Sequence, residues 1–111
     1  MSQTDNRRYE RIPFSTDLTI VDLATQLEYE GHSINLSLGG ISFYAERFFD
    51  TGSRIMICAR ADRSGAGPVT SISATVQWCR IEGDGTIMGA EFDQSLSRSF
   101  HPELCERLCS A

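Results

Sequence analysis

Short apolar stretches separated by glycine-containing turns dominate the sequence from residue 14 onward. Polar and apolar residues partly alternate in the segments 14–23 and 26–36, and they recur in the segment 54–61. In the longest run, 69–81, every second position from Ile72 to Trp78 is apolar. A period of two is typical of strands with one buried face. The pattern therefore predicts a mainly β domain in which Ile72, Ala74, Val76 and Trp78 share one face.

Glycines mark the reversals between these segments. The predicted turns lie at 38–40, 50–52, 65–68 and 83–85. The first turn leads into a strand with Ile41, Phe43 and Tyr44, and the last closes a hairpin into the strand 87–92. Six to seven short strands in this order predict a largely antiparallel sheet that closes into a small β-barrel, because closure leaves no exposed strand edge.

The two ends of the chain differ from this pattern. Residues 1–12 are polar and lack a sustained apolar period, so we expect a flexible N-terminal leader. Pro102 favours a helix start, and we expect a C-terminal α-helix over 103–108 with Leu104 and Leu108 packed inward. The predicted domain therefore comprises the leader, 1–12, and the barrel with its closing helix, 13–111.

Composition limits the classes of function. The 111 residues and 41% hydrophobic content suffice for one compact domain. A net charge of −5 argues against a binder of nucleic acid polymers or of membrane surfaces, which favour a basic face. No apolar run is long enough for membrane insertion.

Catalytic and metal-binding patterns are missing from the sequence. The four cysteines, Cys58, Cys79, Cys105 and Cys109, form no CxxC pair and follow no secretory leader, so we expect free thiols and a cytoplasmic protein. Cys105 and Cys109 alone make an incomplete zinc site, and core packing is the better interpretation. His32 and His101 belong to no nucleophile motif. We expect neither an enzyme nor a metal site.

Two clusters of side chains remain as candidate chemistry. Arg7, Arg8 and Arg11 place three guanidinium groups within five residues of an otherwise acidic chain. Arginine clamps phosphate through paired hydrogen bonds and reaches the O6 and N7 acceptors of guanine. The alternative is a solvated basic tail.

The second cluster is Asn35-Leu36-Ser37-Leu38-Gly39-Gly40. Short hydrogen-bonding side chains at Asn35 and Ser37 end a strand, and the glycines permit close approach of a ligand or another backbone. Taken alone, these are ordinary turn residues.

Together the clusters match the motif RxxxR followed by [D/N]xSxxG. Because of this match, the chain resembles the PilZ domain family. The segments Ala74-Thr75-Val76-Gln77-Trp78 and Met88-Gly89-Ala90-Glu91-Phe92 resemble later strands of that barrel, so the resemblance covers nearly the whole chain. It implies a PilZ-type β-barrel that binds cyclic di-GMP.

By this resemblance, Arg7 and Arg11 grip the phosphates and guanines of the cyclic dinucleotide, and Arg8 adds charge or a stacking plane. Asn35 and Ser37 present polar groups to the guanines, and Gly40 keeps the turn clear of the base. The amide of Asn35 offers one carbonyl acceptor, whereas the family's commoner carboxylate accepts two guanine donors.

Two interpretations of Trp78 stay open. It forms an additional wall of the nucleotide site, or it belongs to the core, where a tryptophan in an alternating apolar strand is more often found.

The leading hypothesis is a stand-alone cyclic di-GMP receptor. Binding orders residues 5–12, and this change passes to an unidentified downstream protein. Two alternatives are a PilZ-like interaction module that binds no nucleotide and an oligonucleotide-binding barrel. The latter predicts a salt-sensitive affinity for single strands that grows with strand length.

Overall fold

The computed structural model describes residues 11–60 and 69–95, which form seven strands. They are β1 (Ile12–Pro13), β2 (Asp17–Asp22), β3 (Glu28–Leu36), β4 (Gly40–Ala45), β5 (Arg54–Arg60), β6 (Val69–Glu82) and β7 (Gly85–Phe92). Strands β2 to β7 correspond to the six predicted strands. The short β1 lies where the sequence pattern has no period of two and overlaps the end of the predicted leader.

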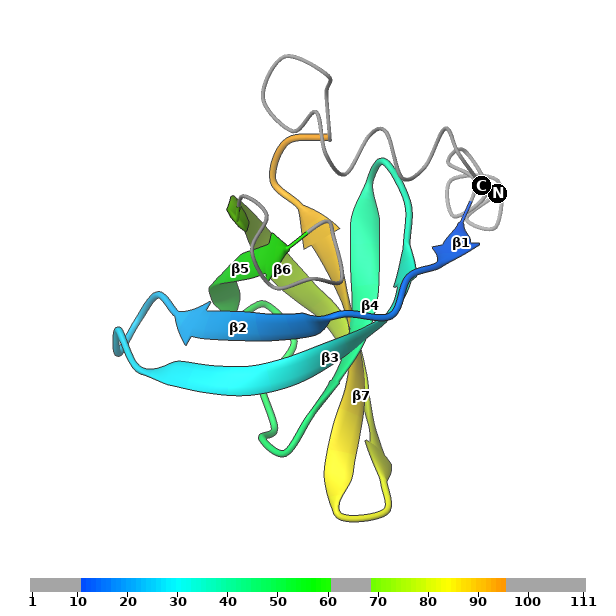
Figure 1. The fold of residues 1–111 in the computed structure, drawn as a ribbon. Helices are drawn as coiled ribbons and strands as arrows, with labels where there is room; N and C mark the ends of the chain where they lie inside the picture. Colours follow the sequence, from blue (N-terminus) through cyan, green and yellow to red (C-terminus); the bar gives the residue numbers. More distant parts are fainter. Residues whose placement is uncertain (1–10, 61–68, 96–111) are drawn as a thin grey trace, which may run out of the picture.

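All strand pairs are antiparallel, and six strands close into a barrel (Figure 1). The order β3-β2-β5-β6-β7-β4 closes through an additional β3–β4 pairing. Outside this ring, β1 pairs with the end of β3, with Ile12 opposite Leu36 and Pro13 opposite Asn35. The predicted antiparallel barrel is confirmed for the described part of the chain.

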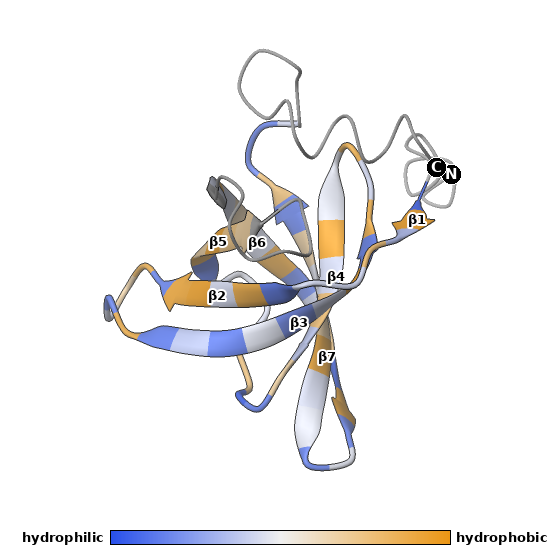
Figure 2. Ribbon diagram, viewed as in Figure 1, coloured by the Kyte–Doolittle hydropathy of each residue, from blue (hydrophilic) through white to orange (hydrophobic). Residues whose placement is uncertain are grey.

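Alternating apolar side chains fill the barrel interior. Leu18 and Ile20 of β2, together with Ile55 and Ile57 of β5, are at most 3% exposed. Figure 2 shows bands of hydrophobic colour on β2, whereas much of β3 has hydrophilic colours, and exposed positions alternate along most of β3. The largest fully buried side chains also include Phe14, Phe43, Leu36, Met88 and Val76. Burying such side chains contributes roughly 1.5–3 kcal/mol each, which makes this interior the main source of stability.

Two bulges interrupt the alternation. One lies between Ser33 and Asn35 of β3, and the other lies between Val76 and Trp78 of β6. An extra residue in one strand reverses which side chains face inward beyond it. Both bulges therefore change the residues that the outer face of the barrel presents.

Buried Ser33 fixes the connection between β1 and β2. Its hydroxyl donates to the carbonyl of Phe14 and accepts from the amide of Thr16 at 2.9 Å. The amide of Ser33 donates to the carbonyl of Thr16 at 2.9 Å. These bonds hold the start of the barrel, immediately after β1, against β3.

The predicted C-terminal helix and most of the predicted leader lie outside the described residues. Within 11–60 and 69–95, no helix is long and apolar enough to cross a membrane.

Candidate ligand-binding groove

One row of residues crosses five strands on the outer face of the barrel. Pro13 of β1 lies opposite Asn35 of β3, and Asn35 lies opposite Ser42 of β4. Ser42 lies opposite Gly89 of β7, which in turn lies opposite Trp78 of β6. The pairing thus brings segments distant in the sequence into one line.

A groove of about 480 Å³ lies along this row. That volume falls within the roughly 300–1,000 Å³ usual for small-molecule sites. The residues that line the groove include Arg11, Asn35, Ser37, Gly39, Gly40, Ser42, Gln77, Trp78, Gly89, Glu91 and Ser95. Among the predicted site residues, Arg11, Asn35, Ser37, Gly40 and Trp78 therefore line the same groove. Arg7 and Arg8 lie outside the described residues.

The Ser37 hydroxyl organises the turn between β3 and β4. It accepts from the amides of Gly39 at 3.2 Å and Gly40 at 3.1 Å, and it donates to the carbonyl of Gly40 at 3.3 Å. The amide of Ser37 also donates to the Gly40 carbonyl at 2.9 Å. Ser37 therefore shapes the wall of the groove through its turn, in addition to the ligand contact that the resemblance implies.

Gly40 is required by the packing of two strands. A Cβ atom at this position would lie 2.5 Å from the carbonyl oxygen of Ala90 on β7. Real Cβ atoms do not approach a backbone oxygen this closely, so a side chain here would push β4 away from β7. The glycine has a structural reason beside the ligand-related role that the sequence suggests.

Trp78 lies on the outer face, and the prediction that it shares one face with Ile72, Ala74 and Val76 is wrong. Its side chain lies over Gly89, where an added Cβ would meet the indole Nε1 at 2.1 Å, and the residue is 43% exposed. The bulge at Gln77 reverses the alternation after Val76, which turns Trp78 outward and Cys79 toward the core. Of the two interpretations of Trp78, the wall of a groove fits this position.

Sequence reasoning missed two polar features of the groove. The hydroxyl oxygen of Ser42 is buried and has no hydrogen-bond partner within the described part of the chain. Gln77 donates to Glu91 across β6 and β7 at 3.5 Å. The alternation of Ile41, Ser42 and Phe43 is a signal that places Ser42 outward, whereas the position of Gln77 depends on a bulge.

The described lining residues carry balanced charge, with a guanidinium at Arg11 and a carboxylate at Glu91. Arg11 directly precedes β1, whose Ile12 lies opposite Leu36, the residue before Ser37. Arg7 lies four residues before Arg11, and four residues span at most about 14 Å. The chain itself therefore keeps Arg7 within about 14 Å of Arg11, which lines the groove.

Asp93 fastens the chain where it leaves β7 beside the groove. Its carboxylate pairs with the Arg54 guanidinium and accepts from the Thr75 hydroxyl at 3.2 Å, and its amide donates to the Ser73 carbonyl at 3.0 Å. Partial burial raises the pKa of Asp93, but hydrogen bonds from Ser73 and Thr75 and the nearby Arg54 charge outweigh it. The net effect lowers the pKa of this carboxyl.

We expect Asp93→Asn to reduce stability at neutral pH by about 1 kcal/mol or less, since the pair is partly exposed. The folded pKa lies below the unfolded one, so the contribution is present above the unfolded value and is lost as pH falls through the folded value. Urea unfolding of both proteins between pH 7 and 3 should show the difference shrinking below about pH 4. A constant difference would contradict the assignment.

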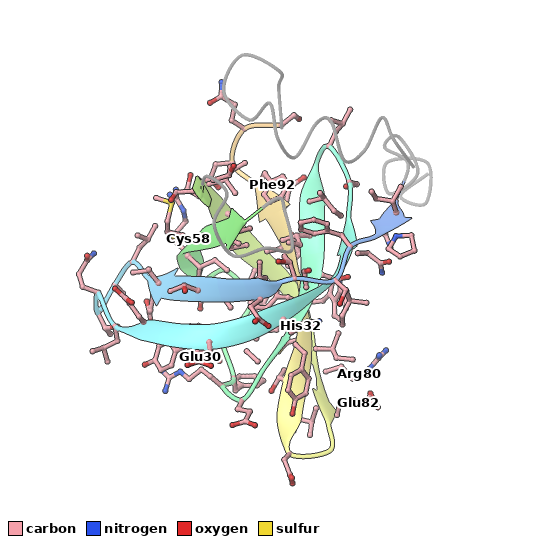
Figure 3. All side chains as sticks on the ribbon, in the orientation of Figure 1. Glu30, His32, Cys58, Arg80, Glu82 and Phe92 are labelled. Carbon is pink, nitrogen blue, oxygen red and sulfur yellow. The ribbon has the colours of Figure 1, made fainter. Side chains whose placement is uncertain are left out.

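His32 is exposed on β3 (Figure 3) and is not among the residues that line the groove. Its Nε2 lies 2.7 Å from the Ser15 hydroxyl and its Nδ1 lies 3.1 Å from the Asp17 carboxylate. The Asp17 side chain is 97% exposed, so solvent screens this pair. The three residues link the β1–β2 connection to β3 on the outside of the barrel.

Cys58 and Cys79 are free thiols. The described residues contain no group of three or more His, Cys, Asp or Glu side chains able to hold a metal ion. Cys105, Cys109 and His101 lie outside the described part of the chain.

The described part of the chain thus forms a closed antiparallel barrel with a groove on its outer face. The model of the family described as "PilZ domain" matches residues 5–109. The chain therefore belongs to the PilZ domain family, whose members are receptor or adaptor domains. Comparison with curated proteins gives no match.

Solved structures agree with this fold. The PilZ domain of YcgR from Escherichia coli, solved with c-di-GMP, has a TM-score of 0.72 at 20% identity, with 94% of this chain and 89% of that chain covered. The Bacillus subtilis inhibitor of motility, MotI/DgrA, has a TM-score of 0.71 at 18% identity, covering 94% of this chain. This chain spans about half of MotI/DgrA, 52%. The PilZ domain of CeSA from a cellulose-synthesizing bacterium has a TM-score of 0.60 at 13% identity, with 91% of this chain and 96% of that chain covered.

Proposed function

We propose that this domain is a cytoplasmic, non-enzymatic receptor that binds cyclic di-GMP in the groove and signals to a partner protein. The observation that supports this most is the meeting of both motifs at one place. Arg11 of RxxxR and Asn35, Ser37 and Gly40 of NxSxxG line the same groove although they are distant in the sequence. The YcgR domain of the same fold, solved with c-di-GMP, adds support.

The chemistry of the groove suits a guanine dinucleotide. The exposed face of Trp78 offers a stacking surface for a base, and Asn35 and Ser42 bring polar groups to the floor between the strands. The described lining contains one cation, Arg11, and one carboxylate, Glu91. A ligand with two phosphate charges therefore needs Arg7 and Arg8 as well, and we infer that both approach the groove when the ligand binds.

Signalling follows from the place of the RxxxR motif before the first strand. Ordering residues 5–12 over the ligand costs on the order of 1 kcal/mol or more per residue, which simultaneous arginine contacts offset. The new surface formed by this segment and the bound ligand is what a partner protein would recognise. Amide hydrogen exchange in residues 5–12 should slow on ligand addition, and unchanged exchange would contradict this step.

Trp78 provides a direct test of binding because it is the sole tryptophan of the chain. Titration with cyclic di-GMP should change its fluorescence, and calorimetry should give a matching affinity. GTP, GMP and a short single-stranded DNA serve as competitors and should bind far more weakly. No heat and no fluorescence change at high micromolar ligand would support a PilZ-like interaction module without nucleotide binding.

We expect Asn35→Asp to tighten cyclic di-GMP binding about 3- to 10-fold. A carboxylate accepts both donors of the guanine edge, and hydrogen bonds to ionised acceptors are roughly twice as strong as neutral ones. Calorimetry of both proteins measures the change. Gln94→Glu, the same change of charge at an exposed residue outside the lining, controls for repulsion of the phosphates. Weaker binding in Asn35→Asp alone would mean that position 35 does not contact the guanine edge.

A further inference from the structure

The end of β6 has an unpaired edge within the described part of the chain. Residues 69–75 of β6 pair with β5, whereas residues 78–82, beyond the bulge at Gln77, pair with β7 alone. The β6–β7 hairpin projects from the barrel body at this end (Figure 1). Among the described residues, no strand pairs with the other side of 78–82, so its backbone groups can accept another strand; proteins commonly protect such edges.

The side chains along this edge do little to repel a second strand. Ile81 is 75% exposed. Arg80 and Glu82 carry opposite charges, and Arg80 Nε lies 3.4 Å from Glu82 Oε2. Figure 3 shows both on the same side of the hairpin. The edge therefore has neither proline nor a net charge, the usual devices against edge pairing, and it exposes an apolar residue between complementary charges.

We propose that the free edge of β6 pairs with the same edge of a second copy, forming a two-fold antiparallel dimer centred on Ile81. In this register, Ile81 lies opposite its counterpart. Arg80 lies opposite Glu82 of the partner subunit, and the two-fold axis repeats this pair. Residues directly opposite in an antiparallel pair share a face, so both ion pairs form on one face and the isoleucines meet on the other.

Charge complementarity selects this register over its neighbours. Centring the pairing on Arg80 places two guanidinium groups opposite each other, and centring it on Glu82 does the same with two carboxylates. Like charges directly opposite destabilise a strand pair. The Ile81 register is the one of these three in which both charges find opposite partners.

The contact is short, so the dimer is weak. Interfaces below about 1,200 Å² are typical of transient complexes, and we expect dissociation constants from tens of micromolar to about 1 mM. The same strand carries Gln77 and Trp78, which line the groove. The second copy therefore sits beside the ligand site, although this dimer requires no ligand and stands independently of the proposed function.

Sedimentation equilibrium of the full chain without ligand, from about 20 μM to 1 mM, tests the dimer. The wild type should self-associate. Arg80→Glu and Glu82→Arg should each weaken self-association about tenfold, because each places like charges in both symmetric pairs. An equimolar mixture of the two variants should associate again, because two carboxylates on one variant then face two guanidinium groups on the other.

The mixture separates the contact between copies from the ion pair within one hairpin, because mixing leaves each hairpin unchanged. Thermal unfolding of each variant shows whether the barrel is intact, and Leu27→Asp, at an exposed apolar residue of another hairpin, is the matched surface control. A monomeric wild type at 1 mM, or variants that associate as the wild type does, would overturn the proposal. So would a mixture that stays monomeric.

Discussion

Arg11→Ala should weaken cyclic di-GMP binding about 10- to 100-fold. Arg11 is the cation among the described residues that line the groove, and a hydrogen bond to a charged group contributes about 1.5–3 kcal/mol. Removing it leaves Glu91 as the charged group of that described lining, which opposes an anionic ligand. Calorimetry and Trp78 fluorescence, measured side by side at fixed ionic strength, give the change.

Arg47→Ala is the matched control for this change. Arg47 lies over the rings of Tyr29 and Phe49, at 4.8 and 5.6 Å, and does not line the groove. The Arg47→Ala variant removes the same charge from the domain as Arg11→Ala. Its loss of affinity therefore measures the long-range electrostatic contribution to binding alone. Equal losses of affinity in both variants would show that Arg11 acts only through net charge. This result would contradict the proposal that the ligand binds in the groove.

Arg7→Ala extends the test beyond the described residues. If Arg7 and Arg11 clamp the same ligand, each single variant loses most of the affinity, and the double variant loses less than the product of the two. Such non-additivity is expected for groups that share one partner. Independent, multiplicative losses would indicate that the two arginines meet separate parts of the ligand.

The fold could be predicted from the sequence because its strands carry a period of two and its turns carry glycine. The hairpin at 83–85 is an example, since Gly83 has φ of +61° and closes β6 onto β7 as expected. Strand β1 could not be predicted in the same way. Its two residues pair through the backbone with the end of β3 and leave no periodic signal.

The site could be predicted in its residue types more fully than in its geometry. The two motifs identified Arg11, Asn35, Ser37 and Gly40, which line one groove. The outward position of Trp78 depends on the bulge at Gln77, and a bulge is set by pairing with another strand. For the same reason, Gln77 became visible as a lining residue only when β6 and β7 were placed in register, whereas the alternation around Ser42 already indicated its outward direction.

Gly40→Ala should lower stability by about 1–3 kcal/mol without any ligand present. The added Cβ would meet the Ala90 carbonyl at 2.5 Å, so β4 and β7 must separate at a point where both also form the groove. For a domain of this size, 1 kcal/mol corresponds to about 4–8 °C in Tm. Differential scanning calorimetry of the ligand-free proteins measures the shift.

Gly83 offers a comparison, because glycine is favoured there by the backbone conformation and not by contact with neighbouring atoms. Its φ of +61° is left-handed, but an added Cβ there meets nothing within 4 Å. Asparagine tolerates this conformation, so Gly83→Asn should cost little, whereas Gly40→Asn should cost at least as much as Gly40→Ala. If Gly40→Ala instead keeps its Tm and loses only ligand affinity, then contact with the base, and not closure of the barrel, is the reason for glycine in this motif.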